Sequence, residues 1–245
     1  MNSPSLLDLK IKAGKTARQV IQDGSFSLDA IRTYCGPATG PRWLAASGFD
    51  LSLLRAAVLG RTWPVLLVGA SAGAWRFAAW IQPEAEKSYS NLMDAYMEAV
   101  YTKEDTPATI SATLERILNN AIDDDAAPFA LAHRRYRLAV ITARSRHLIA
   151  SERRWIQYTG LGLCYAMNAL NRSLLRYFAE PVVFYTGPKP PFFTLQPSFS
   201  GRHVALSQVN LKPALLATGA IPLVVAGVRD IYGAPRGVYR DGGLT

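Results

Sequence analysis

Residues 65–77 read VLLVGASAGAWRF, and their pattern indicates the fold class. Its first four residues are apolar, β-branched at both ends and followed by Gly69, which is the pattern of a buried strand in a parallel sheet. Good helix formers follow from residue 72 until Pro83 ends the pattern. The order of buried strand, glycine-flanked turn and helix predicts an α/β protein.

Strand and helix patterns alternate along the rest of the chain. Thr106, which precedes Pro107, and Asn210 are the expected N-caps of two helices. Because strands that alternate with helices form βαβ units, we predict a mostly parallel sheet that is covered by helices on both faces. The expected helices are residues 51–59, two within 84–122, 162–178 and 211–218, and the expected strands are 136–142, 182–185 and 239–240.

The composition places the chain among folded proteins. Its 245 residues are 49% hydrophobic, and 27 Lys and Arg against 18 Asp and Glu give a net charge of +9, which favours anionic partners. Two cysteines, Cys35 and Cys164, are too few for a zinc site, and we predict neither a metal nor a cofactor. We find no signal peptide and no apolar run of the roughly 20 residues that span a bilayer, so we expect a cytoplasmic or peripheral membrane protein.

Residues 69–73 (GASAG) match the Gly-X-Ser-X-Gly pattern of a nucleophile elbow, and they lie between a predicted strand and a predicted helix, where that pattern has a mechanism. Gly69 and Gly73 permit a strained turn and a close approach of strand and helix. The helix N-terminus adds unpaired N–H groups, including that of Ala72. Ser71 is therefore the candidate nucleophile, and an ordinary or anion-binding turn is the alternative.

A serine nucleophile needs a base, and the chain has three histidines. His203 follows the order Ser, acid, His of α/β-hydrolases if one of the aspartates at 123–125 is the acid, but no loop signature surrounds it. His133 and His147 lie in arginine-rich stretches, where a cationic imidazole is disfavoured. None of the three is a convincing base. The aspartate run itself is typical of a solvated loop rather than of a metal site.

The stronger candidate base is Asp241, within the sequence YRDGG at residues 239–243. A short strand is expected to run into this turn, where Gly242 and Gly243 let the backbone approach another loop closely. An Asp-Gly-Gly sequence alone is also an ordinary turn. Its combination with the Ser71 elbow, in a chain without a suitable histidine, is more specific.

Together these segments resemble the patatin-like phospholipases of the bacterial type. The resemblance implies a three-layer α/β/α fold with a mostly parallel central sheet, and a Ser–Asp dyad that acts without histidine. Ser71 matches the nucleophile of the family and Asp241 matches its base. The segments that carry the resemblance run in the family's order across most of the chain: residues 36–43 (GPATGPRW), 69–77 (GASAGAWRF), 151–154 (SERR), 211–228 (LKPALLATGAIPLVVAGV) and 239–243 (YRDGG).

The first of these segments resembles the oxyanion loop of the family, but it departs from the usual run of adjacent glycines. Pro37 and Pro41 have no N–H and cannot donate a hydrogen bond. Arg42 matches a basic position of the family, where it would hold the loop or a lipid phosphate, and a surface arginine fits the pattern equally well. The remaining candidate backbone donors are Ala38, Thr39 and Gly40, together with Ala72 beside the nucleophile.

The resemblance implies a lipid acyl hydrolase, of the phospholipase A or esterase type, that cleaves acyl esters through an acyl-enzyme. Its expected partners are a lipid or other acyl ester and, peripherally, an anionic membrane. The alternative is an inactive or truncated patatin-like protein that binds anionic membrane as a basic module, because the oxyanion loop is altered and arginines concentrate within residues 134–154.

No nucleic-acid-binding module fits the sequence, so nucleic acid is not an expected partner. The sequence leaves the oligomeric state open. Residues 1–245 fit one patatin-like domain, and we expect a truncated or minimal version because the family continues beyond the Asp-Gly-Gly motif.

Overall fold

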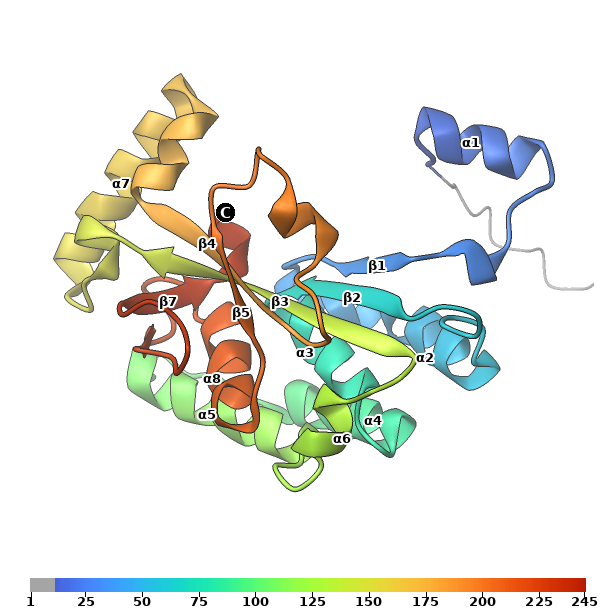
Figure 1. Ribbon diagram of the computed structural model, residues 1–245. Helices are drawn as coiled ribbons and strands as arrows, with labels where there is room; N and C mark the ends of the chain where they lie inside the picture. Colours follow the sequence, from blue (N-terminus) through green and yellow to red (C-terminus); the bar gives the residue numbers. More distant parts are fainter. Residues whose placement is uncertain (1–11) are drawn as a thin grey trace, which may run out of the picture.

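The computed structural model describes residues 12–245, which form an α/β protein around a seven-stranded mixed sheet (Figure 1). Five strands follow one another across the sheet in the order β1-β2-β3-β4-β5, and β7 pairs with both β3 and β6. The strands are β1 (Thr33–Gly36), β2 (Val65–Ala70), β3 (Tyr136–Ser145), β4 (Ala179–Tyr185), β5 (Arg202–Ala205), β6 (Val228–Arg229) and β7 (Val238–Asp241).

The sequence pattern predicted a mostly parallel sheet, but the sheet is mixed. The pairs β1–β2, β2–β3 and β4–β5 are parallel, whereas β3–β4, β3–β7 and β6–β7 are antiparallel. The reason is the path of the chain between β3 and β4. Ser145, at the end of β3, lies opposite Ala179, at the start of β4. Because the connection returns to the edge of the sheet that it left, β4 must run back along β3.

The predicted strands and helices are present, with shifted ends. The helix expected at 162–178 begins at Arg154 and is followed by a separate 3₁₀ turn. Ser207, rather than Asn210, is the N-cap of the helix near residue 211, and Asn210 is its partner in a capping box. The helices are α1 (Lys15–Gln22), α2 (Ser47–Ala56), α3 (Ala72–Trp80), α4 (Ala85–Glu98), α5 (Pro107–Ala121), α6 (Ala127–Leu131), α7 (Arg154–Leu170) and α8 (Gln208–Thr218).

One face of the sheet is covered by α3 and α8, with α4, α5 and α6 beyond them (Figure 1). Every residue of α3 is buried, because this helix is enclosed by the sheet on one side and by helices on the other. The largest side chains of the main core come from this region, including Phe77, Trp80 and Tyr89. The helix that follows Ser71 is thus held rigidly from all sides.

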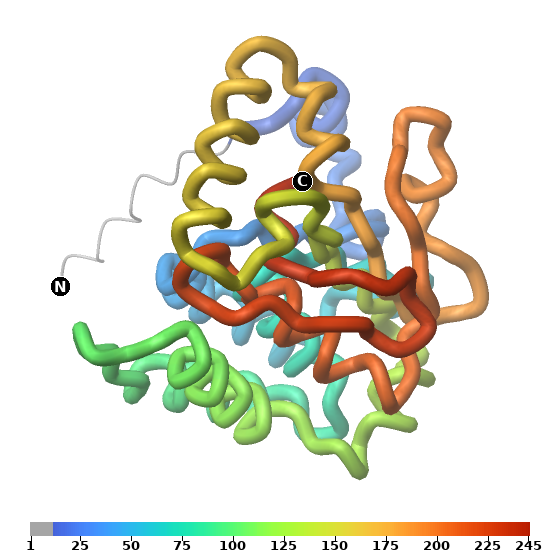
Figure 2. Tube along the Cα trace, turned by 90° about the vertical axis from the view of Figure 1, so that its left-hand side faces the viewer, coloured from blue at the N-terminus to red at the C-terminus, as the bar shows by residue number. Residues whose placement is uncertain are grey.

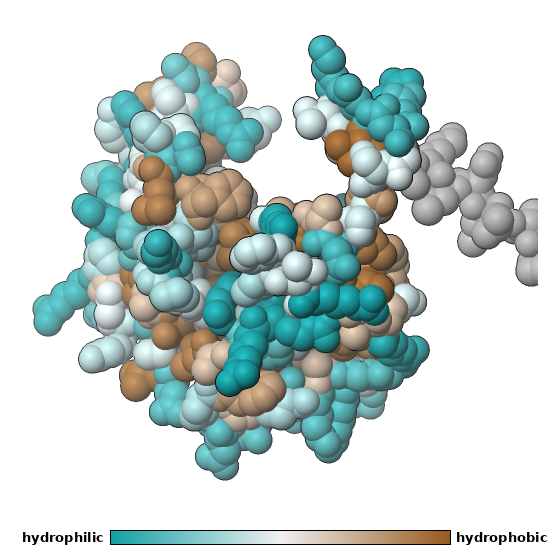
Figure 3. All heavy atoms as spheres, turned by 45° about the vertical axis from the view of Figure 1, so that its right-hand side comes forward, coloured by the Kyte–Doolittle hydropathy of each residue, from teal (hydrophilic) through white to brown (hydrophobic). Residues whose placement is uncertain are grey.

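The opposite face of the sheet has a sparser cover. Phe193 and Phe199, from the loop between β4 and β5, pack on Val68 and Val183. One face of α7 packs on a second small cluster that includes Phe178. The rest of α7 stands out from the body of the protein in two perpendicular views (Figures 1 and 2). In the space-filling view α1 also projects, with a hollow beside it (Figure 3), and none of its residues is buried. No helix within residues 12–245 combines the length and the apolar character needed to cross a membrane.

A buried ion pair lies beneath the sheet. Asp50 of α2 is fully buried and pairs with the buried Arg76 of α3. The same carboxylate accepts hydrogen bonds from the hydroxyls of Tyr34, at 2.6 Å, and Tyr89, at 2.7 Å. Burial, together with the bond to Asp50, raises the pKa of Tyr34 to about 12, so this hydroxyl stays a donor. The cluster ties β1, α2, α3 and α4 together.

We expect Asp50→Ala to lower the free energy of unfolding by about 3–5 kcal/mol, because the Arg76 guanidinium would stay buried without its counter-charge. Urea denaturation of the purified protein measures this change. Asp94→Ala removes an exposed carboxylate of α4 and is the matched control, with an expected change within about 0.5 kcal/mol. Equal changes in the free energy of unfolding for the two substitutions would contradict the proposed contribution of the cluster to stability.

Candidate active site

Ser71 lies at the sharp turn between β2 and α3, as the sequence pattern predicts. Its φ of 53° and ψ of −131° place it outside the regions that non-glycine residues ordinarily occupy. The flanking glycines are required by close packing. A Cβ on Gly69 would lie 2.4 Å from the Ala74 nitrogen, and one on Gly73 would lie 2.0 Å from the Gly36 carbonyl oxygen. The turn is therefore strained at Ser71 and closed tightly on both sides.

Thr218, the last residue of α8, holds this turn from behind. The Ser71 N–H donates to Thr218 Oγ1 at 2.8 Å, and that hydroxyl in turn donates to the Ile141 carbonyl at 2.5 Å. Thr218 is fully buried. The Ser71 amide is thus engaged and does not serve as a donor to a substrate. Sequence reasoning missed this residue, because a threonine at the end of an apolar helix carries no signal of its own.

Asp241 ends β7 and lies in register with Thr142 of β3. Its own N–H donates to the Ala220 carbonyl at 3.0 Å, and its Oδ1 accepts from the Gly243 N–H at 2.7 Å. A Cβ on Gly242 would lie 2.1 Å from the Ile141 carbonyl oxygen, so the turn after Asp241 is pressed against β3. These contacts fix the carboxyl group beside the part of β3 that is level with the end of β2, where Ser71 follows.

The structure brings Asp241 to Ser71, and both are buried, each with 7% of its surface exposed. Burial raises the pKa of the Asp241 carboxyl above its ordinary value. The Gly243 N–H and the Ser71 hydroxyl oppose this effect and lower the pKa, because both favour the charged carboxylate. The two predicted members of the dyad are therefore neighbours, and the acid is shifted in the direction that makes it a better base.

The glycine-containing loop after β1 meets both halves of this site. Gly36 contacts Gly73, and the Ala38 side chain lies against Gly243. Within residues 12–245, the amides of the loop candidates donate to no other protein group. Gly40 has a φ of 53° and lines the pocket beside Ser71. The loop candidates with free amides are Ala38, Thr39 and Gly40.

The structure separates the remaining two candidates of the oxyanion region. Ala72 lines the pocket, and its amide lies in the first turn of α3, where N–H groups have no partner within the helix. Arg42 has an exposed side chain and does not line the pocket. The expected role of Arg42, to hold the loop or a lipid phosphate, stays a prediction.

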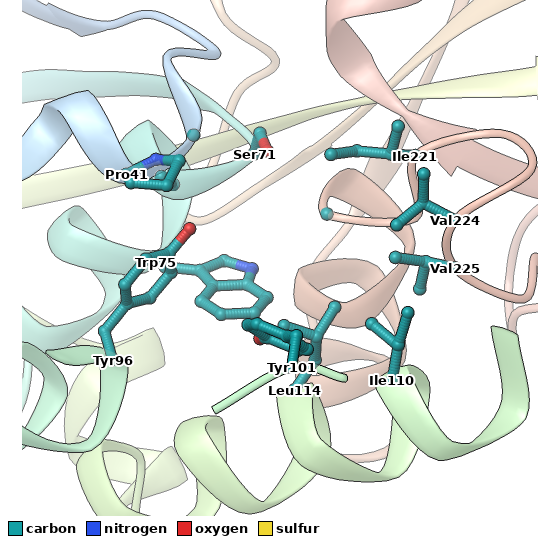
Figure 4. A pocket seen from close by; sticks show the side chains of 13 residues that line it. Pro41, Ser71, Trp75, Tyr96, Tyr101, Ile110, Leu114, Ile221, Val224 and Val225 are labelled. Atoms are coloured by element: carbon teal, nitrogen blue, oxygen red, sulfur yellow. The ribbon is translucent and has the colours of Figure 1, made fainter. Parts of the chain in front are cut away.

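A pocket of about 310 Å³ opens beside Ser71 (Figure 4). Its wall is formed by α3, by α4 and α5 with their connection, and by the segment after α8. In the close view Ser71 lies at one end with Pro41 and Ile221 on either side, and Trp75 lies deeper. The Trp75 indole N–H donates to the Leu215 carbonyl at 2.7 Å, which fixes the ring. The lining residues are Gly40, Pro41, Ser71, Ala72, Trp75, Tyr96, Tyr101, Ile110, Leu114, Gly219, Ile221, Val224 and Val225.

None of the three histidines lines this pocket. The Nδ1 atom of His133 accepts from the N–H groups of Arg135 and Tyr136, which is a structural cap, and burial lowers its pKa. His203 is exposed on β5, at an end of the strand order. The histidines that the sequence left as weak candidates are thus elsewhere in the described part of the chain.

The aspartate run at 123–125 is exposed, as expected of a solvated loop, and Asp124 pairs with Lys212 at 2.7 Å. In the described residues, no group of three or more His, Cys, Asp or Glu side chains is arranged to hold a metal ion.

Arg240 is a second residue that sequence reasoning missed. It is fully buried, and its guanidinium donates to the carbonyls of Ile149 and Val225, each at 3.2 Å. It also pairs with Glu152 at 2.7 Å. Because Val225 lines the pocket, Arg240 joins the strand that carries Asp241 to the pocket wall. The pairing also accounts for Glu152 within the SERR segment.

The chain matches no protein-family model, no curated protein sequence and no solved structure.

The raised pKa of Asp241 predicts how stability depends on pH. As pH rises from about 4, the unfolded chain ionises this carboxyl first, so the folded state loses stability until Asp241 also ionises. Asp241→Asn removes this penalty. We expect the variant to be more stable than the wild type at pH 7, with a difference that disappears as pH falls below about 4.

Urea denaturation at several pH values measures this difference. The matched control is Asp94→Asn on the exposed face of α4, for which we expect no pH-dependent gain. A variant that is less stable than the wild type at pH 7 would contradict the assigned direction.

Proposed function

We propose that the protein is an acyl ester hydrolase in which Ser71 is the nucleophile and Asp241 the general base. One observation carries the proposal: a strained serine and a buried carboxyl group, drawn from segments 170 residues apart, meet at the end of an apolar pocket. Strained backbone and perturbed pKa values concentrate at functional sites. A purely structural Ser–Asp contact would not need an open pocket beside it.

In the proposed mechanism, Asp241 accepts the proton of the Ser71 hydroxyl while Oγ attacks the ester carbonyl carbon. The amides of Ala72 and of the loop at Ala38–Gly40 donate to the oxygen that becomes negative. The carbon–oxygen bond to the alcohol then breaks, and protonated Asp241 gives its proton to the leaving alkoxide. Water, deprotonated by Asp241, attacks the acyl-enzyme and releases the carboxylic acid and free Ser71.

The apolar pocket supports a lipid acyl group as the substrate. Nearly all of the lining side chains are aliphatic or aromatic, and the volume lies at the lower end of the range for small-molecule sites. An unbranched hydrocarbon chain makes no polar demands on such a wall. Phospholipids and simple fatty acyl esters share this chemistry, so the proposal is a phospholipase A or esterase type of activity.

We also propose that the fold is of the patatin-like three-layer type. The support is the order of the elements that carry the site: strand, elbow and helix α3 first, then α8 with the segment that lines the pocket, and last the strand that ends in Asp241. Helices pack on both faces of the sheet, although α7 and the loop before β5 cover one face incompletely.

We expect Ser71→Ala to abolish hydrolysis of p-nitrophenyl acyl esters, and Asp241→Asn to lower kcat by about 100- to 10,000-fold, which is the range for loss of a general base. Ser52→Ala and Asp94→Asn change the same residue types on exposed helix surfaces and should leave turnover unchanged. Circular dichroism verifies that all four variants fold.

A serine-directed fluorophosphonate gives an independent measurement, because it labels only an activated hydroxyl. Label should appear on the wild type and be absent from Ser71→Ala. Undiminished hydrolysis in either dyad variant would overturn the proposal.

Pocket length should set the preference for acyl chains. Ile110 lines the pocket on α5, and Ile110→Trp places a larger side chain in the cavity and so shortens the space for an acyl chain. We expect turnover of p-nitrophenyl palmitate to fall roughly tenfold or more, while turnover of the acetate ester changes little. Ile21→Trp on the exposed surface of α1 is the matched control. Equal losses on both esters would show that the acyl chain lies elsewhere.

A further inference from the structure

Helix α7 is unusually exposed for its composition. It is 17 residues long, yet only Gln157 and Gly160 are buried. Residues 155–171 contain no charged side chain. A helix that faces water on one side ordinarily carries charged residues there. The outer face of α7 is therefore suited to a surface other than bulk water.

The exposed face of α7 is rich in aromatic and aliphatic side chains. The inner face is formed by Leu161, Cys164 and Met167, which pack on the small cluster around Phe178. Residues three and four apart share one face of a helix, so the exposed residues form one continuous surface. These are Trp155 (69% exposed), Tyr158 (55%), Leu163 (49%), Tyr165 (77%) and Leu170 (80%).

Four exposed arginines lie near this surface: Arg153 and Arg154 at the start of α7, and Arg172 and Arg176 in the 3₁₀ turn that follows it. Within residues 12–245 none of the four forms a salt bridge. Between Glu152 and Glu180 the chain has no acidic residue. Both of these glutamates are already paired, Glu152 with Arg240 and Glu180 with Arg144. The net positive charge around α7 is therefore not neutralised by acidic residues of the same segment.

We propose that α7 lies on the surface of an anionic lipid bilayer, with its aromatic face in the interfacial region and its arginines at the head groups. Trp and Tyr favour the membrane interface, and each cationic residue near an anionic surface adds to the attraction. A helix of 17 residues is about 25 Å long, shorter than the roughly 30 Å hydrocarbon core, so it lies along the interface and does not span it.

A second copy of the chain fits this surface less well. A symmetric contact places the same surface on both partners. Two α7 helices packed in this way would bring together eight arginines from residues that include no carboxylate. The charge therefore favours an anionic partner over self-association.

The buried face of α7 is joined to the segment that lines the pocket. The Gln157 side chain accepts a hydrogen bond from the Leu223 N–H at 2.6 Å, so the first turns of α7 contact the segment that lines the pocket. Ile221 and Val224, on either side of Leu223, line the pocket and are 44% and 45% exposed. A bilayer beneath α7 would lie near this apolar rim. Docking itself does not depend on the hydrolytic chemistry at Ser71.

Flotation of the full chain with lipid vesicles tests the proposal. Ser71→Ala protein is used so that the lipid is not altered during the measurement. Ser71→Ala protein with an unchanged α7 should float with vesicles of phosphatidylcholine and phosphatidylglycerol, but far less with vesicles of phosphatidylcholine alone. The triple substitution Trp155→Ser, Tyr165→Ser and Leu170→Ser should reduce binding roughly tenfold or more.

The matched control changes three exposed residues of similar type outside α7: Trp63→Ser (59% exposed), Tyr232→Ser (68%) and Val209→Ser (64%). This control should bind as the parent does. Equal binding of the two triple variants would overturn the proposal.

A second pair of variants tests the charges. Arg172→Glu with Arg176→Glu should weaken binding to anionic vesicles roughly tenfold or more and reduce its dependence on salt. Arg116→Glu with Arg134→Glu makes the same change in net charge at exposed positions outside α7, and it should retain binding. If both pairs weaken binding equally, the whole charge of the protein is responsible and α7 is not the docking site.

Sedimentation velocity tests the alternative that a second copy of the chain, and not a bilayer, covers this surface. If the protein is a dimer that becomes monomeric in the α7 triple variant, a second copy covers this surface and the proposal is wrong. The outcomes are also separate from those for the proposed function. If the protein binds vesicles through α7 but hydrolyses no ester, the docking proposal stands and the proposed function is wrong. If it hydrolyses esters but does not bind vesicles, the proposed function stands and the docking proposal is wrong.

Discussion

The strained backbone at Ser71 is the constraint on which the rest of the site depends. Such a conformation costs on the order of 1–3 kcal/mol and persists only where its surroundings leave no alternative. Here β2 is held between β1 and β3, α3 is buried along its whole length, and Gly73 touches Gly36. Thr218 occupies the Ser71 N–H from behind. The position of the Ser71 hydroxyl is therefore set by the packing of the surrounding elements and not by the backbone conformation that a serine ordinarily adopts.

Among the described residues, the arrangement of charged side chains on β7 leaves the Asp241 carboxyl group without a positively charged partner. Arg240 and Asp241 are adjacent, yet successive side chains of a strand point to opposite faces. Arg240 is directed to Glu152 and to carbonyls of Ile149 and Val225, so its charge is satisfied away from Asp241. The pKa of Asp241 is accordingly governed by burial, and its opposing contacts are neutral groups. An arginine on the same face of β7 as Asp241 would pair with it, lower the pKa of its carboxyl group and leave a weaker base.

The features that could be predicted from the sequence are those that neighbouring residues determine. The strand, elbow and helix at residues 65–80 follow from local patterning, and Thr106 is the N-cap that its spacing indicates. The direction of β4 was not predictable in the same way, because it depends on where α7 returns the chain. Thr218 and Arg240 escaped notice since their partners, Ser71, Glu152 and Val225, are distant in sequence. Asp241 was a candidate base from the sequence, but its burial and its contact with Ser71 depend on the fold.

The hydrogen bond between Gln157 and Leu223 has a geometric consequence. Leu223 has a φ of 69°, so the backbone there is already in an uncommon conformation and has little freedom to adjust separately from its partner. The side chain of Gln157 is itself buried and anchored to the Ser151 carbonyl at 2.8 Å. The position of the pocket rim around Leu223 therefore depends on the position of α7. Tilting that helix would carry the rim with it, and the width of the entrance would be set by the angle at which α7 leaves the sheet.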